Sequence, residues 1–111
     1  MAMTLGQHQE AFSRDLHKLV AKAYELGYEI RRGEVQRMPE MQAIYVQTGR
    51  SKTLLSDHLT KCAADLHFFK NGKLCYPEGL GRYWESLNPI NRAGMFWKSF
   101  KDAPHFERHV R

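Results

Sequence analysis

Cysteine is scarce in this 111-residue chain, since Cys62 and Cys75 are the only two and do not form a CxxC pair. Two thiols cannot supply the sulfur ligands of a zinc site built from four cysteines. The first ten residues contain no apolar stretch of signal-peptide type, which argues against Sec-dependent export. We therefore expect both thiols to be reduced and to pack as small, half-buried side chains.

Long apolar segments are also missing, and no run approaches the roughly 20 residues that a membrane-spanning helix needs. Hydrophobic residues make up 42% of the chain and charged residues 26%, a balance that fits a folded protein better than a disordered one. The length is that of one domain with a modest core, residues 1–111. We expect a monomer without stable membrane association.

Acidic residues are outnumbered, because 17 Lys and Arg stand against 12 Asp and Glu and give a net charge of +5. A basic surface attracts polyanions. Nucleic acid and the anionic polymer of a cell wall fit this charge equally well, so the charge alone does not decide the partner. No internal repeat, low-complexity segment or linker is visible.

Three segments have the spacing of helices. Apolar residues predict a long amphipathic helix over residues 5–26, which begins with a capping-box pattern at residues 4–7 and is followed by Gly27. A second helix is predicted over residues 39–49, since Pro39 suits the first helical position. A third is predicted around Leu80, Tyr83, Trp84 and Leu87.

Strands are predicted between and after these helices, at residues 28–35, 62–70, 73–76, 94–97 and 105–110. Asn71-Gly72 predicts a type I′ hairpin turn. Alternation places Asp65 and His67 on one face of the strand at 62–70 and the apolar Ala64, Leu66 and Phe68 on the other. The mixture predicts an α+β fold, a small antiparallel sheet with flanking helices in a single domain.

Several potential metal ligands follow one another along the chain. Zinc in a hydrolase takes three protein ligands, commonly imidazole and carboxylate, and leaves a fourth position to water. The sequence offers Ser56-Asp57-His58, then Asp65, then Asp102-Ala103-Pro104-His105-Phe106-Glu107. Strand alternation puts His105, Glu107 and His109 on one face. The rigid Ala103-Pro104 bend can point Asp102 toward the water that the metal would activate.

Two other interpretations of these histidines compete with a metal site. The chain has six histidines, so chance pairs are common and a single histidine is more often an ordinary surface or core residue. His105 and His109 also have the spacing of a helical pair. Pro104 and the nearby end of the chain leave little room for a helix, which favours a strand.

Two motifs carry a resemblance to a known family. The pattern Ser-x-His-x-x-Gly-x-Ala-x-Asp is matched at Ser56, His58, Ala63 and Asp65, and an acidic residue three positions before a histidine is matched at Asp102 and His105. With these motifs, and a similar stretch upstream, residues 28–108 resemble the zinc peptidases that include D-alanyl-D-alanine carboxypeptidases, L-alanyl-D-glutamate endopeptidases and phage endolysins. Lys61 replaces the family glycine, a residue that usually marks positive φ or close approach.

The resemblance implies a zinc ion held by His58, Asp65 and His105, with Asp102 as the carboxylate that handles protons. Glu107 is the alternative candidate for the proton-handling carboxylate, because it follows His105 by two residues and can face the same site. We prefer Asp102 because its position matches the family motif.

Two further residues have roles under the same resemblance. Arg37 is expected to bind a substrate carboxylate or the developing oxyanion, the alternative being a plain surface salt bridge. Ser56 is expected to orient His58, the alternative being a hydroxyl that stabilises the loop.

The leading hypothesis is a phage-type endolysin, a zinc peptidase that acts on the stem peptides of peptidoglycan. Such an enzyme would accumulate in the host bacterial cytoplasm and reach the wall after membrane breach. The bond that it cuts and its native metal stay open. The second hypothesis is a basic nucleic-acid-binding domain with a structural zinc or none, although no recognised motif supports it. Its footprint would be Arg31, Arg32, Arg37, Arg50 and Lys52.

Overall fold

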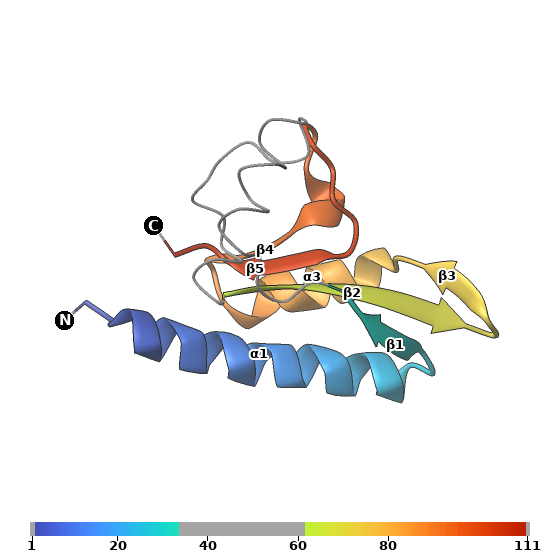
Figure 1. Ribbon diagram of the computed structural model, residues 1–111, viewed down its shortest axis with the longest axis horizontal. Coiled ribbons are helices and arrows are strands. Elements are labelled where there is room, and N and C mark those ends of the chain that lie inside the picture. Colours follow the sequence, from blue (N-terminus) through green and yellow to red (C-terminus); the bar gives the residue numbers. More distant parts are fainter. Residues whose placement is uncertain (1, 34–61, 111) are drawn as a thin grey trace.

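The computed structural model describes residues 2–33 and 62–110 of the chain (Figure 1). The helix predicted over residues 39–49 lies outside this part. The elements are α1 (Leu5–Glu25), β1 (Glu29–Arg32), β2 (Ala63–Lys70), β3 (Lys73–Cys75), α3 (Glu78–Leu87), β4 (Asn91–Ala93), the 3-10 helix η1 (Gly94–Phe96) and β5 (His105–Arg108). In the described ranges, no helix has the length and apolarity needed to cross a membrane.

The five strands form one sheet in which every pairing is antiparallel. The order is β1-β2-β5-β4, and β3 pairs with the far end of β2. In the register of β2 and β5, Asp65 lies directly opposite His105. In the register of β4 and β5, Arg92 lies opposite Glu107. In each of these two pairs, the strand pairing makes neighbours of polar residues that lie far apart in the sequence.

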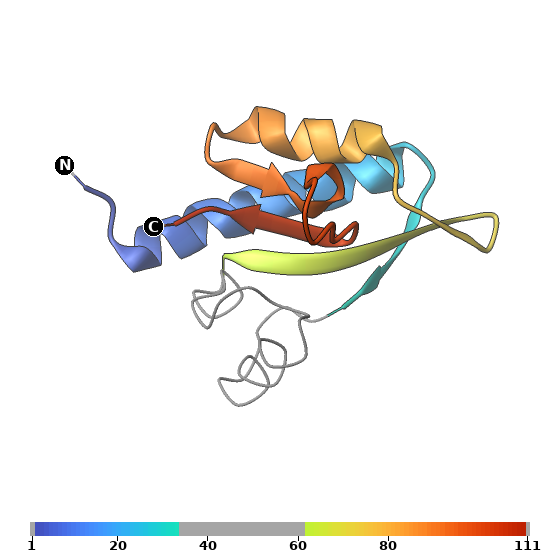
Figure 2. The same ribbon diagram turned by 90° about the horizontal axis from the view of Figure 1, so that it is seen from above.

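Helices α1 and α3 cover the same face of the sheet (Figure 2). The Trp84 side chain of α3 is fully buried at the centre of this layer. Its ring meets those of Phe12 and Phe106 edge-on, with centroids 5.6 and 6.0 Å apart, and its Nε1 donates to the carbonyl oxygen of Glu107 at 3.0 Å. The buried side chains of the sheet that complete this core include Ala64, Leu66, Phe68 and Phe106. The fold is α+β, as predicted.

The predicted capping box of the first helix and the predicted type I′ turn of the hairpin are confirmed. Thr4 Oγ1 accepts from the backbone N–H of Gln7, and Gln7 Oε1 accepts from that of Thr4, which completes the capping box. After the helix, Gly27 has φ +89°. Asn71 and Gly72 both lie in the left-handed region, with φ of 54° and 77°, as a type I′ turn requires.

The prediction of a strand at residues 94–97 is wrong. Gly94–Phe96 form η1 instead, and the strand β4 comes just before them. The carbonyl oxygen of Gly94 accepts from the backbone N–H of both Trp97, at 3.2 Å, and Asp102, at 3.1 Å. It therefore closes a loop and takes no part in a strand ladder. The predicted strand at 105–110 is shorter than expected, since β5 spans four residues. Within the prediction at 28–35, β1 covers Glu29–Arg32, and residues 34 and 35 lie outside the described residues.

Candidate metal centre

Strands β2 and β5 position a polar cluster on the face of the sheet opposite the helices. Phe68 of β2 and Phe106 of β5 point into the core, so their alternating neighbours point the other way. Asp65, His105 and Glu107 therefore share this second face, as the alternation in the sequence predicts. The backbone N–H of Gly33, after β1, donates to the carbonyl oxygen of Asp65 at 2.8 Å and holds this part of β2.

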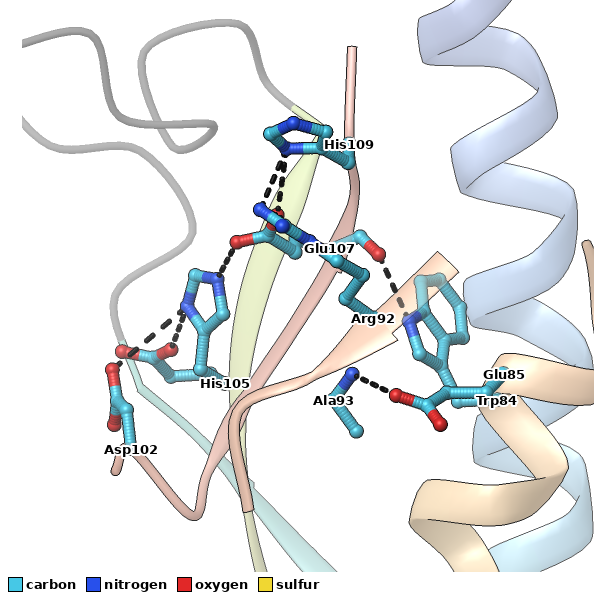
Figure 3. Close-up of polar contacts among 9 residues, drawn as sticks. Trp84, Glu85, Arg92, Ala93, Asp102, His105, Glu107 and His109 are labelled. Carbon is cyan, nitrogen blue, oxygen red and sulfur yellow. Dashed lines mark hydrogen bonds and ion pairs between the residues drawn. The ribbon is translucent and has the colours of Figure 1, made fainter. Parts of the chain in front are cut away.

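Asp65, Asp102 and His105 converge at this face. Their potential ligand atoms all lie within 4.8 Å of one another. The Nδ1 atom of His105 is 3.4 Å from Asp65 Oδ1. The same atom is 3.9 Å from Asp102 Oδ2 (Figure 3). Asp102 reaches the cluster through the turn at Ala103-Pro104, in which the backbone N–H of His105 donates to the Asp102 carbonyl oxygen at 3.1 Å.

The other nitrogen of His105 is held by Glu107. His105 Nε2 lies 2.7 Å from Glu107 Oε1, and both side chains are almost completely buried. An ionised carboxylate only accepts hydrogen bonds, so Nε2 carries the hydrogen. In the neutral imidazole the lone pair is then on Nδ1, the atom that faces Asp65 and Asp102. This is the tautomer that a metal ligand at Nδ1 requires.

The second oxygen of Glu107 is occupied as well. Arg92 of β4 donates to Glu107 Oε2 from Nη2 at 2.7 Å and from Nε at 3.1 Å, and His109 Nδ1 lies 3.3 Å from the same oxygen. Figure 3 shows Glu107 between the rings of His105 and His109, with Arg92 beside it. Both carboxylate oxygens are thus engaged within a chain of charged groups, and the carboxylate is fixed in place.

The carboxylates make this site favourable for a positive charge. Burial lowers the pKa of His105, but hydrogen bonds to Asp65 and Glu107, together with their charges, outweigh it and raise the pKa from 6.5 to about 9. The negative surroundings that favour an imidazolium would also favour a metal cation. Asp65 and Asp102 differ in access to solvent, because their side chains are 15% and 39% exposed.

An aromatic rim borders the cluster. Tyr76 shares a 2.8 Å hydrogen bond with Nδ1 of His67, which lies two residues from Asp65 on the same strand. Burial raises the pKa of the Tyr76 hydroxyl, and the charges of Asp102 and Asp65 add to the effect, so the phenol stays protonated at neutral pH. The ring centroid of Trp97 lies 5.1 Å from that of His105.

The structure brings together three of the predicted site residues, Asp65, Asp102 and His105. The remaining ones, Arg37, Ser56 and His58, lie outside the described residues together with Lys61, and their roles stay predictions. Arg92 and Tyr76 were not predicted from the sequence as members of the site. Alternation signals the pairing of His105 with Glu107, but the position of Arg92 depends on β4, which was not predicted.

No family model matches the chain, and a search of curated proteins found no match. Among solved structures, the chain is similar to the crystal structure of the Serratia marcescens L-Ala D-Glu endopeptidase ChiX. The TM-score is 0.68 at 24% sequence identity, over 94% of this chain and 85% of that one. The similarity establishes a shared α+β fold.

Proposed function

We propose that this protein is a zinc-dependent peptidase of the phage endolysin type, which hydrolyses a stem-peptide bond of bacterial peptidoglycan. The observation that carries the proposal is the convergence of Asp65, Asp102 and His105 around one point, with Glu107 behind His105. The shared fold with an L-Ala D-Glu endopeptidase supports it. The Ser56–Asp65 and Asp102–His105 motifs resemble those of the zinc peptidases, and this resemblance supports the same function.

The residues present fit a zinc site. Zinc in hydrolases takes imidazole and carboxylate ligands, and by residue type His58, Asp65 and His105 would form such a set. Histidines that bind metals commonly donate their second N–H to a carboxylate, which fixes the ring and strengthens the ligand. Glu107 makes this contact with His105 at 2.7 Å. When bound, zinc would lower the pKa of a coordinated water toward about 7 and polarise the scissile carbonyl.

Asp102 is the carboxylate that we assign to proton transfer. It is the more exposed of the two carboxylates at the cluster, so it can meet both the attacking water and the substrate. Its carboxylate would take a proton from that water and pass it to the nitrogen of the leaving amine. Glu107 is poorly suited to this task, because His105 and Arg92 engage its two oxygens and the side chain is 5% exposed.

The substrate contacts follow the same proposal. Arg37 would bind a substrate carboxylate or the developing oxyanion, and Ser56 would orient His58. The bond we propose is the one between L-Ala and D-Glu, since the similar solved structure is an L-Ala D-Glu endopeptidase. The protein would accumulate in the host bacterial cytoplasm and act on the wall after membrane breach. Its net charge of +5 suits an anionic wall polymer.

Digestion of purified peptidoglycan sacculi tests the proposal directly. The expected products by mass spectrometry are peptides that begin with D-Glu, and muramidase digestion of the remaining glycan should then give disaccharides that retain L-Ala. A chelator should stop their release, and added zinc should restore it. If zinc-loaded protein releases no peptide and instead binds DNA with a steep salt dependence, the nucleic-acid-binding hypothesis takes its place.

A further inference from the structure

The segment between η1 and the turn before β5 presents aromatic and cationic side chains to solvent. Residues 97–101, Trp-Lys-Ser-Phe-Lys, form this stretch, which we name the 97–101 loop. Lys98, Phe100 and Lys101 are exposed, and Trp97 is half-buried. In Figure 1 the chain rises away from the sheet here, between η1 and β5.

Phe100 has an unusual backbone conformation. Its φ is +55°, in the left-handed region, where a bulky side chain is disfavoured. The residue is nevertheless 53% exposed, so it is not part of the buried core. Backbone strain of this kind is concentrated at functional sites, where the surrounding structure maintains it.

The loop is held at its base and borders the candidate metal centre. The Gly94 carbonyl oxygen accepts from the backbone N–H of Trp97 at one end and from that of Asp102 at the other. Asp102 is the proposed proton acceptor, and the Trp97 ring packs against the ring of His105. A polymer whose peptide bond lies at the centre must therefore extend past this loop or away from it.

The charge of the 97–101 loop favours a polymer that extends past the loop over one that extends away from it. Lys98 and Lys101 lie on either side of Phe100, and the 97–101 loop has no acidic residue. The guanidinium of Arg92 adds a third cation 5.9 Å from the Trp97 ring centroid. Exposed aromatic rings suit the flat apolar faces of sugars, and ammonium groups suit the carboxylates of the stem peptides.

We propose that the 97–101 loop is a docking surface for peptidoglycan beyond the bond that is cut, with Phe100 against the glycan strand and Lys98 and Lys101 near its carboxylates. This inference rests on the proposed function. The loop keeps the protein on the insoluble polymer beside its own catalytic centre. Phe100, which is 53% exposed between the two lysines, would supply the apolar part of this contact.

Cosedimentation with purified sacculi, using the full chain with and without a chelator, tests the inference. Phe100→Gly should raise the Kd for sacculi about fivefold, the effect of losing one aromatic contact. Its Tm should not fall, because glycine adopts positive φ without strain. The double variant Lys98→Gln with Lys101→Gln should also bind more weakly, and its binding should depend less on salt.

Two substitutions at the β2–β3 hairpin are matched controls. Leu74 is 53% exposed, the same fraction as Phe100, and Lys73 is an exposed lysine on the same strand. Leu74→Ala and Lys73→Gln should bind sacculi as the unchanged protein does. Binding losses of equal size in the control and loop variants would overturn the inference.

Further outcomes separate this inference from the proposed function. If Phe100→Gly binds sacculi unchanged, or if the loop variants lose affinity for DNA and not for sacculi, the docking surface is refuted. Wild-type protein that cuts soluble stem peptides but shows no loop-dependent binding also refutes it while leaving the peptidase intact. Loop-dependent binding to sacculi without any zinc-dependent cleavage supports the surface and refutes the peptidase.

Discussion

Nε2 of His105 and Oε1 of Glu107 lie 2.7 Å apart, and this contact determines which nitrogen of His105 is left for a metal. With its hydrogen on Nε2, the imidazole presents Nδ1 to Asp65 and Asp102. Glu107 therefore acts on the candidate centre through His105. Its function can be separated experimentally from that of Asp102, which borders the same point directly.

Glu107→Gln should weaken zinc binding, by about 10- to 100-fold, because the supporting carboxylate loses its charge. Competition with a chelator of known affinity measures this change, and excess zinc should restore part of the turnover. Glu78→Gln is the control, since Glu78 is exposed and pairs with Arg82 one turn further along α3. A variant that binds zinc normally and stays inactive at any zinc concentration would instead make Glu107 the proton acceptor.

Asp102→Asn should lower turnover and leave zinc affinity nearly unchanged, the opposite of what we expect for Glu107→Gln. Turnover of peptidoglycan should fall by about 10²- to 10⁴-fold, the usual contribution of a positioned general base or acid. Zinc affinity should change little, because the proposed ligands are His58, Asp65 and His105. The two constants are measured on the same preparation, by peptide release and by chelator competition. An active Asp102→Asn protein would show that the assignment is wrong.

The raised pKa of His105 predicts how stability depends on pH when a chelator is present. The pKa is 6.5 in an unfolded chain and about 9 in the folded one, so between these values the folded protein binds the additional proton. The stabilisation, about 3 kcal/mol at most, is complete below pH 6.5 and is lost as the pH rises through 9. Urea unfolding between pH 6 and 10 measures it.

His105→Gln should remove this decline in the free energy of unfolding between pH 6.5 and 9. His17→Gln, which replaces an exposed histidine of α1, should retain it. The same decline in both variants would mean that another group titrates in this range and that the carboxylates around His105 do not stabilise its charged form.

The sequence predicted those features that depend on neighbouring residues. The capping box of α1, the Asn71-Gly72 turn and the alternation of β2 follow from the local chain, and alternation also placed Asp65 and His105 on corresponding faces of their strands. The loop from Gly94 to Asp102 was not predictable in this way, because it depends on one carbonyl oxygen that accepts both from the nearby Trp97 N–H and from the more distant N–H of Asp102. The contact of Arg92 with Glu107 likewise requires the register of β4 and β5.

Gly94→Ala should disturb both the fold and the candidate centre. A Cβ atom at residue 94 would collide with the carbonyl oxygen of Asp102 and would lie 3.0 Å from Cβ of His105. The first contact is with backbone, so no side-chain rotation relieves it. We expect a loss of about 1–3 kcal/mol in the free energy of unfolding, typical of overpacking, which denaturant titration measures.

The same substitution should also lower zinc affinity and turnover, because the atoms it displaces belong to Asp102 and His105. The matched control is Gly79→Ala in α3, where a Cβ meets no heavy atom within 4 Å, so stability should be unchanged or slightly higher. A Gly94→Ala protein with wild-type stability and zinc affinity would show that the chain can relax around residue 94. The close approach of Gly94 would then not be what positions Asp102 beside His105.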